Sequence, residues 1–471
     1  MTDISIERAP AATKGTSRFY FAAWRWHFYA GLYVVPFLLM LAITGLVMLW
    51  FTAIAPEYGN RIPVVPRDKA LTVDEQAKAA LAAHPQGTIG EYVAPYDAAT
   101  PAVFRVDLAD GARMLAVDPY SGAILQDRPQ EGTWNAFAEG IHGELMLGGN
   151  GGIGDFLIEV AASLGLLMIV TGLFLAWPRN GRPVRDMVVP NFSARGRALW
   201  KSLHTVVGTW MAIVLLFFLV TGLSWTNIWG GKFVQAWSTF PAEKWDAVPL
   251  SDKTHAHLNP GELETVPWAL EQTPLPMSGS EAGAPGVPAG TPVAFGSIVD
   301  LGRALGFKGR FQVSYPSGDD GVWTLSQDSM SYDSSDPTAD RTVHVDRYTG
   351  KVLADVRFAD YSLGGKAMAV SIALHEGMMG TWNIVLNFAF CLLIIVLVGS
   401  GVVMWWKRRP SGVARLGAPP MPGEVPFPRG ALPILLGLAL LFPVLGLTLL
   451  AVLMLDVLVL SNIPAIRKAL S

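Results

Sequence analysis

The stretch "HTVVGTWMAIVLLFFLVTGL", residues 204–223, begins with a histidine and continues as an apolar run long enough to cross a bilayer. Residues 27–46, "HFYAGLYVVPFLLMLAITGL", align with it without a gap. In both stretches a glycine follows the histidine by four residues, and Thr-Gly-Leu ends the run. A repeat constrains an architecture more firmly than a single motif, so the match predicts two copies of one membrane helix.

A second pair of stretches extends the repeat. "IHGELMLGGNGGIGDF" (141–156) precedes an apolar run that ends in "TGLFLAWPR" (171–179). "LHEGMMGTWN" (374–383) precedes a run that ends in "SGVVMWWKR" (400–408). Each half of the chain is therefore expected to consist of a helix, a polar domain and a second helix.

The two polar segments also resemble each other. "AVDPYSGAIL" (116–125) and "HVDRYTGKVL" (344–353) share Val-Asp-x-Tyr-Ser/Thr-Gly between β-rich runs. The pattern predicts a turn in which the aspartate caps the backbone and the glycine takes a positive φ. A short helix is expected before the strands, at about 74–84 in one segment and 297–305 in the other.

The composition is that of a membrane protein, with 51% hydrophobic and only 15% charged residues. The net charge of −3 indicates no nucleic-acid partner. We expect an α-helical transmembrane bundle of four core helices from a duplicated helix–domain–helix unit, two α+β external domains, and a C-terminal hydrophobic segment. The predicted boundaries are the N-terminal segment 1–26, first span 27–52, first domain 56–133, second span 154–177, loop 178–201, third span 202–226, second domain 230–365 with a flexible insertion at about 240–295, fourth span 381–406, loop 407–430, and C-terminal segment 431–460.

Lysine and arginine residues concentrate in the segments 1–26, 178–201 and 407–430. The positive-inside rule places these segments in the cytoplasm and the two polar domains outside. We therefore expect a multi-pass protein with a cytoplasmic N-terminus and two external domains, which in a Gram-negative cell would lie in the periplasm.

The C-terminal run 431–460 is longer than one span and contains Pro433 and Pro443. A tilted single crossing and a broken re-entrant hairpin both fit this pattern. We favour the single crossing.

Four histidines occupy matched positions in the repeat. His27 and His204 begin the first and third spans, whereas His142 and His375 precede the second and fourth. Packing of the repeats about a pseudo-twofold axis would bring His27 opposite His204 at the cytoplasmic edge, and His142 opposite His375 at the external edge. Two facing imidazoles are the axial ligands that a six-coordinate haem iron requires, so the sequence predicts two haem groups, about 20 Å apart. Both would be held without covalent attachment, because no C-x-x-C-H motif is present.

Four further residues are expected at the cytoplasmic pair. Gly31 and Gly208 share a helix face with the histidines and would leave room for the macrocycle, while Arg25 and Lys201 could pair with haem propionates. Each residue also has a simpler interpretation, because histidines hydrogen-bond between membrane helices and glycines allow helices to pack closely. A zinc or copper ion is a further alternative, although two histidines would leave its coordination shell incomplete.

Three other histidines lie in the second polar domain. His255 and His257, in "THAHLNP", fall on one side of an extended segment and could bind a metal or contact a substrate. Solvated loop histidines are the simpler interpretation. His344 has no counterpart in the repeat, because Ala116 occupies that place.

The four histidine-bearing helices, the two "VDxY[ST]G" domains and the "LHEGMMG" and "WWKRR" stretches resemble the PepSY-associated transmembrane family over roughly residues 18–410. The resemblance implies two periplasmic PepSY-like domains and a bacterial inner-membrane iron reductase with two b-type haems. It proposes His27, His142, His204 and His375 as the haem ligands. The implied substrate is a ferric siderophore or another ferric chelate, which is reduced on the periplasmic side to release Fe(II).

We therefore expect a haem-dependent oxidoreductase, embedded in membrane lipid, that transfers electrons across the bilayer. A separate cytoplasmic electron donor is expected, because no G-x-G-x-x-G nucleotide signature is present. Two alternatives stay open. One is a membrane-bound binding or regulatory protein in which the histidines only pack. The other is a transporter of iron, haem or a siderophore, which the repeat favours, although the four core spans lack acidic residues at their midplane.

Overall fold

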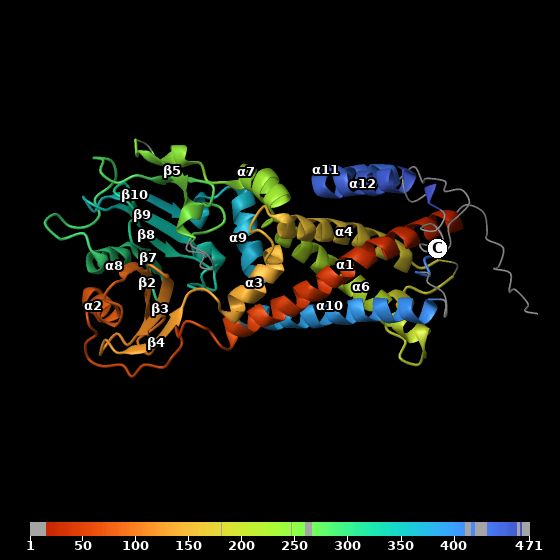
Figure 1. The fold of residues 1–471 in the computed structure, drawn as a ribbon, viewed down its shortest axis with the longest axis horizontal. Helices are drawn as coiled ribbons and strands as arrows, with labels where there is room; N and C mark the ends of the chain where they lie inside the picture. Colours follow the sequence, from red (N-terminus) through yellow and green to blue (C-terminus); the bar gives the residue numbers. More distant parts are fainter. Residues whose placement is uncertain are drawn as a thin grey trace, which may run out of the picture. The chain divides into compact units, whose positions relative to one another are not determined.

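The computed structural model describes residues 16–179, 181–245, 247–259, 266–409, 416–419, 431–458 and 462–463. These residues form two compact units. The first unit consists of the described parts of Met1–Ala42, Leu147–Trp229 and Phe390–Ser471, and the second of Ile43–Met146 and Gly230–Ala389. The strands all belong to the second unit (Figure 1).

Four helices in the described part of the chain are long and apolar enough to cross a membrane. They are α1 (Thr16–Ala53), α4 (Ile153–Ala176), α6 (Arg197–Leu223) and α10 (Thr381–Arg408). They match the four predicted spans, but α1 and α6 begin earlier and take in residues that we assigned to the adjoining segments. Within the first unit, Phe218 of α6 stacks on Phe390 of α10 with ring centroids 4.1 Å apart.

The connections between the spans contain short helices that the sequence did not predict. The link before α6 holds α5 (Arg185–Val188), and a π-helix, η1 (Asn227–Val234), follows α6 and continues into α7 (Gln235–Ser238). Much of the predicted segment 1–26 and of the predicted loop 407–430 lies outside the described residues.

The C-terminal run forms two short helices instead of the single crossing that we favoured. These are α11 (Ala431–Leu441) and α12 (Pro443–Leu458), and both are too short to count as membrane spans. The chain breaks at Phe442–Pro443 because proline lacks the N–H that would continue the helix. It turns so sharply there that a Cβ on Gly446 would lie 2.9 Å from the Cβ of Ala439.

One eight-stranded sheet organises the second unit, in the order β10-β9-β8-β7-β1-β2-β3-β4 (Figure 1). Its strands are β1 (Thr88–Val93), β2 (Ala102–Leu108), β3 (Gly111–Val117), β4 (Ile124–Pro129), β7 (Gln312–Ser314), β8 (Val322–Gln327), β9 (Arg341–Asp346) and β10 (Val352–Arg357). We expected two separate domains. Instead β1 and β7 pair antiparallel, with Tyr92 opposite Val313, and merge them into one sheet. The pairing removes two strand edges that separate domains would expose.

The helices α2 (Val73–Ala83) and α8 (Phe295–Leu305) confirm the two short helices predicted before the strands. The core that they share with the sheet is centred on Phe104, Ile298 and Phe311, which are fully buried. Apolar burial on both halves of the sheet therefore holds the second unit together.

The two predicted turns are also confirmed. Asp118 accepts a hydrogen bond from the N–H of Tyr120 at 2.8 Å, and Gly122 has a φ of +73°. Asp346 accepts one from Tyr348 at 2.8 Å, and Gly350 has a φ of +66°. Both motifs are therefore structural, as their residue types indicated.

The described part of the insertion at 240–295 is packed, although we expected a mobile loop. Its strands β5 (Leu250–Thr254) and β6 (Pro274–Pro276) pair with each other. Trp268 and Leu270 are buried. Burial of these side chains outweighs the turn-rich composition, because each removes a large apolar surface from water.

Candidate functional site

His27 of α1 and His204 of α6 lie together in the first unit. Their ring centroids are 6.4 Å apart, and the ring planes are almost perpendicular, at 85°. The structure thus brings together the two rings that the repeat placed opposite each other. Their role as ligands stays a prediction.

The tautomer of His27 follows from its hydrogen bonds. Its Nδ1 lies 3.0 Å from Oγ1 of Thr171 on α4. The Thr171 hydroxyl donates its own hydrogen to the Leu167 carbonyl at 2.8 Å. Nδ1 of His27 must therefore carry the proton and donate to Thr171, which leaves the lone pair on Nε2.

His204 is held in the same way by α10. Its Nδ1 lies 3.0 Å from the carbonyl oxygen of Leu397 and 3.2 Å from Oγ of Ser400. A carbonyl oxygen only accepts, so Nδ1 carries the proton and Nε2 keeps the lone pair. Histidines that bind a metal through one nitrogen almost always donate from the other in this manner.

Two glycines make room for the imidazoles. A Cβ on Gly172 would lie 3.1 Å from Cε1 of His27, and a Cβ on Gly401 would lie 3.3 Å from Cε1 of His204. Sequence reasoning missed both glycines and the hydroxyls beside them. The signal was present, because Thr171-Gly172 and Ser400-Gly401 begin the matched stretches "TGLFLAWPR" and "SGVVMWWKR".

Gly31 and Gly208 serve helix packing in this structure. A Cβ on Gly31 would lie 3.4 Å from Cε of Met168, and a Cβ on Gly208 would lie 3.4 Å from Cδ1 of Leu397. Flexible apolar side chains therefore border both glycines, as close helix packing at a glycine allows. The role of Gly31 and Gly208 beside a macrocycle stays a prediction.

The two predicted propionate partners differ in their surroundings. Arg25 donates to the carbonyl of Pro419 at 2.5 Å and to the hydroxyl of Tyr29 at 2.9 Å. Lys201 is exposed on α6. Arg25 is thus already engaged, and the pairing of either residue with a propionate stays a prediction.

The second pair belongs to the second unit. His142 lies in the last turn of α3 (Trp134–Glu144), and His375 lies in the last turn of α9 (Leu363–Glu376). Nδ1 of His142 is 2.8 Å from Oγ1 of Thr44, the threonine of the repeated Thr-Gly-Leu. Desolvation lowers the pKa of His142 to about 4 and that of His375 to about 3, and the nearby His142 contributes to the second shift. Both rings are therefore neutral at pH 7, as metal-binding imidazoles must be.

Two buried asparagines fix the end of α9. Asn387 donates to the carbonyls of Leu374 and His375 at 2.9 and 2.7 Å, and Asn383 donates to Leu374 at 2.9 Å. These bonds satisfy carbonyls that the helix end leaves without helical partners. They also hold the turn that carries the His375 ring.

The distance between the rings of the first pair equals the distance expected of two imidazoles that bind one haem iron. Two iron–nitrogen bonds of about 2.0 Å, with about 1.2 Å from each nitrogen to its ring centre, separate the ring centres by about 6.4 Å. The observed separation of 6.4 Å agrees. Among the described residues, no group of three or more His, Cys, Asp or Glu side chains could hold a metal ion. A bare zinc ion, which takes four ligands, therefore suits this pair less well than a haem, whose porphyrin supplies four nitrogens itself.

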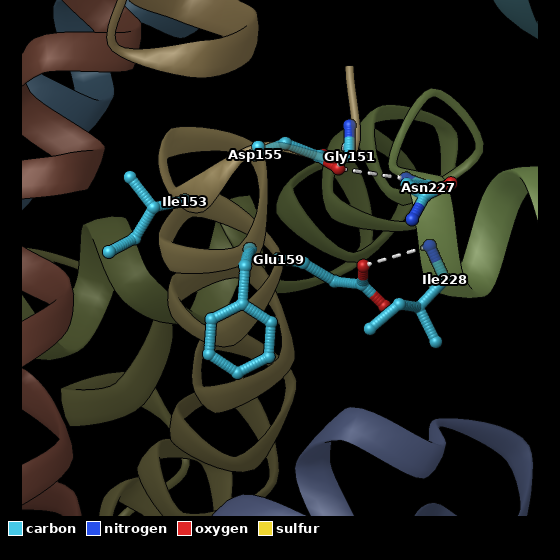
Figure 2. Close-up of a pocket in the computed structure, with 8 residues that line it drawn as sticks. Gly151, Ile153, Asp155, Glu159, Asn227 and Ile228 are labelled. Atoms are coloured by element: carbon cyan, nitrogen blue, oxygen red, sulfur yellow. Dashed lines mark hydrogen bonds between the residues drawn. The ribbon is translucent and has the colours of Figure 1, made fainter. Parts of the chain in front are cut away.

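Two buried carboxylates near the start of α4 were overlooked in the sequence. Figure 2 shows Asp155 and Glu159 pointing toward the start of η1 beside a pocket of about 310 Å³. They accept hydrogen bonds from backbone N–H groups, Asp155 from Gly151 and Asn227 at 3.0 and 3.1 Å, and Glu159 from Ile228 and Trp229 at 3.3 and 3.0 Å. Carboxylates at a helix N-terminus satisfy donors that have no other partner. Both side chains therefore stabilise the connection that follows α6.

A family model described as the PepSY-associated TM region matches residues 24–408. The matched range contains all four paired histidines and the whole eight-stranded sheet. No curated protein matches the chain.

Proposed function

Because the chain belongs to the family of the PepSY-associated TM region, we propose that it is a haem-containing oxidoreductase that passes electrons across a membrane to a ferric chelate. The family match and the four apolar helices make it a membrane protein with PepSY domains. The observation that carries the proposal is the His27–His204 pair, with ring centroids 6.4 Å apart and Nδ1 of each ring engaged by a neighbouring helix.

In this proposal His27 and His204 hold one b-type haem, and His142 and His375 hold a second. A bound haem supplies reversible one-electron chemistry. The chain supplies the ligands and their orientation. The acceptors on Thr171 and Leu397 keep the Nδ1 protons in place, so that Nε2 of each ring stays available and directed.

We further propose that the chain is a duplicated helix–PepSY–helix unit. The strand order is symmetric about the β1–β7 pair, with one short helix and four strands in each half. The hydroxyl–glycine pairs Thr171-Gly172 and Ser400-Gly401 contact the two histidines in corresponding ways. Duplication of one ancestral helix–PepSY–helix unit would account for both correspondences.

The direction of electron flow in this proposal rests on the resemblance to the family. The basic segments support an orientation with the N-terminus in the cytoplasm of a bacterial inner membrane and the sheet in the periplasm. A separate cytoplasmic donor supplies one electron for each Fe(III), and Fe(III) in a siderophore or other chelate becomes Fe(II). Hard oxygen ligands hold Fe(II) more weakly, so reduction releases the metal.

The test is the cofactor content of full-length protein purified from haem-replete cells. We expect a red protein with a low-spin b-type difference spectrum and about two haems per chain by the pyridine haemochrome method. Colourless protein would refute the proposal. Reduction of a ferric chelate should then follow addition of reductant to protein in nanodiscs.

The same experiment separates the two alternatives. A binding or regulatory protein would contain no haem, and a transporter would need a second compartment. Nanodiscs offer no second compartment, so chelate reduction there would argue against transport. The carboxylates of Asp155 and Glu159 give little support to a transporter, because backbone N–H groups already engage them.

A further inference from the structure

His255 and His344 form a third histidine pair, inside the second unit. Their Nε2 atoms are 2.8 Å apart, and both side chains are fully buried. The ring centroids are 4.8 Å apart, much closer than those of His27 and His204. The insertion supplies one ring and β9 the other. The sequence indicated neither the burial nor the contact.

The hydrogen bonds around this pair allow one arrangement of protons. Nδ1 of His255 lies 2.6 Å from the carbonyl of Thr273, so it carries a proton, and Nε2 of the neutral ring accepts. His344 must then donate from its own Nε2. Its Nδ1, 3.0 Å from Oγ1 of Thr324, accepts the hydroxyl hydrogen. Two neutral imidazoles therefore share a single proton between their Nε2 atoms.

The same arrangement suits two metal ligands. Both Nε2 atoms point at one place, while Nδ1 of each ring has an oxygen partner that can orient it. An ion that replaces the shared proton needs the lone pair of His344 on Nε2. The His344 proton then moves to Nδ1, where Thr324 Oγ1 accepts it instead of donating. No proton leaves the site, which gains only the charge of the ion.

The number of ligands selects the class of ion. No group of three or more His, Cys, Asp or Glu side chains in the described part of the chain could hold a metal. Zinc and other divalent ions require four or more ligands, and a fully buried site admits no water to complete their shell. Monovalent d10 ions such as Cu(I) and Ag(I) accept two imidazoles in a linear arrangement. A single charge also has a lower desolvation penalty than a double charge.

Trp245 connects the pair to a pocket. Its ring centroid is 5.9 Å from that of His255 and 6.1 Å from that of His344. Trp245 also lines a pocket of about 440 Å³, together with Lys244 and Val352. Linear coordination requires the Nε2 atoms to separate to about 4 Å. Displacement of Trp245 toward the pocket provides this space, and its π face can stabilise a cation.

We propose that His255 and His344 form a binding site for a soft monovalent d10 cation, Cu(I) or its analogue Ag(I), with Trp245 between the site and the adjacent pocket. The site does not depend on the proposed haem chemistry. It uses an insertion and a histidine that the first half of the chain lacks, so only the second half of the sheet carries it.

The test uses Ag(I), which has the same coordination preference and, unlike Cu(I), does not reduce a ferric haem. Full-length protein in detergent is dialysed against silver nitrate in chloride-free buffer, and bound silver is counted. We expect His255→Gln and His344→Gln each to bind one equivalent fewer than the unmodified chain, because any other sites are the same in all three proteins. Silver bound to the unmodified chain should show two nitrogen neighbours by X-ray absorption.

Two controls separate ligand loss from damage to the fold. His257→Gln alters an exposed histidine two residues away and should bind silver like the unmodified chain. His255→Met replaces one ligand with a thioether that d10 ions accept, so it should restore the lost equivalent.

Thr324→Val, which removes the acceptor for Nδ1 of His344, should weaken binding about tenfold. Equal silver content in the unmodified chain and His255→Gln, or no recovery in His255→Met, would overturn the proposal.

Discussion

The His27–His204 pair and the His255–His344 pair use the same side chain at different separations. In the first pair the ring centroids are 6.4 Å apart, and in the second they are 4.8 Å apart with Nε2 atoms in direct hydrogen bond. Each histidine in both pairs has an oxygen partner at Nδ1. The surrounding elements, and not the ligand type, therefore decide what can lie between two imidazoles.

The elements that hold the rings explain this difference. His27 and His204 belong to two membrane helices, and each ring is held by another helix through Thr171 or Ser400. These contacts keep the rings at the separation of axial haem ligands. His344 belongs to a strand, and the His255 segment packs directly over it. Only a proton or a small ion fits between those two rings.

The largest expected effect comes from loss of one histidine of the His27–His204 pair. His204→Ala should lower the haem content from about two to about one per chain and abolish chelate reduction, because one axial nitrogen is removed. Pyridine haemochrome analysis measures the change. His257→Ala is the matched control and should keep both haems. Unchanged haem content in His204→Ala would exclude this pair as a haem site.

A smaller effect is expected from filling the space beside a ring. Gly172→Ala places a Cβ 3.1 Å from Cε1 of His27, so the ring must shift by a few tenths of an ångström. The low-spin electron paramagnetic resonance signal should change, with partial haem loss. Gly399→Ala introduces a methyl group where no atom lies within 4 Å and should leave the signal unchanged. Identical spectra for Gly172→Ala and the unmodified chain would show that the His27–His204 pair tolerates movement of the His27 ring.

A still smaller effect is expected from loss of the hydroxyl that holds His27. Thr171→Val keeps the shape but removes the acceptor for Nδ1, and should weaken haem retention about tenfold. Haem transfer to apomyoglobin measures the rate of loss. Thr209→Val is the control, because the Thr209 hydroxyl donates to the Thr205 carbonyl of its own helix and, among the described residues, not to a histidine. Equal rates in the two variants would mean that Thr171 does not orient the ligand.

The smallest expected effect is the pH dependence of stability that the His255–His344 pair contributes. Desolvation lowers the pKa of His255 to about 4 and that of His344 well below its usual value, and the neighbouring His255 lowers the pKa of His344 further. The unfolded chain binds protons below pH 6.5 that the folded pair excludes, so the contribution of this pair to the free energy of unfolding should fall as the pH drops from 6.5 toward 4. The slope is at most about 1.4 kcal/mol per pH unit for each histidine.

Thermal unfolding of the silver-free protein at pH 7 and pH 5 checks this prediction. The change in melting temperature should be smaller in His344→Gln, which lacks one of the two buried titrating groups. His257→Gln should behave like the unmodified chain. An equal change in melting temperature in His344→Gln and the unmodified chain would contradict the expected burial of neutral imidazoles.

Local sequence patterns predicted several features correctly. The apolar runs predicted α1, α4, α6 and α10, since a span needs only length and hydrophobicity. Asp118 and Gly122 predicted their turn from residue type alone. The ungapped repeat predicted that His27 and His204 would meet, because equivalent helices pack in equivalent ways.

Other features depended on partners distant in the chain. The repeat showed Thr171-Gly172 and Ser400-Gly401 as matched, but not that they contact the histidines. The sequence did not indicate that β1 of one predicted domain would pair with β7 of the other, with Tyr92 opposite Val313. The Gly- and Pro-rich composition of the insertion predicted a surface loop, although Trp268 is buried. Two prolines in the C-terminal run were compatible with a single crossing and with a broken hairpin, and the structure shows that the helix breaks before Pro443.

The sequence by itself therefore determined the membrane helices, the turns and the meeting of His27 with His204, since these follow from periodicity, hydrophobicity and the matched stretches of sequence. Only the tertiary structure decided which hydroxyl holds each ring, how far apart two rings stand, and that His255 reaches His344. These depend on contacts between segments far apart in the chain, where a difference of about one ångström in side-chain position separates a direct hydrogen bond from room for a metal ion.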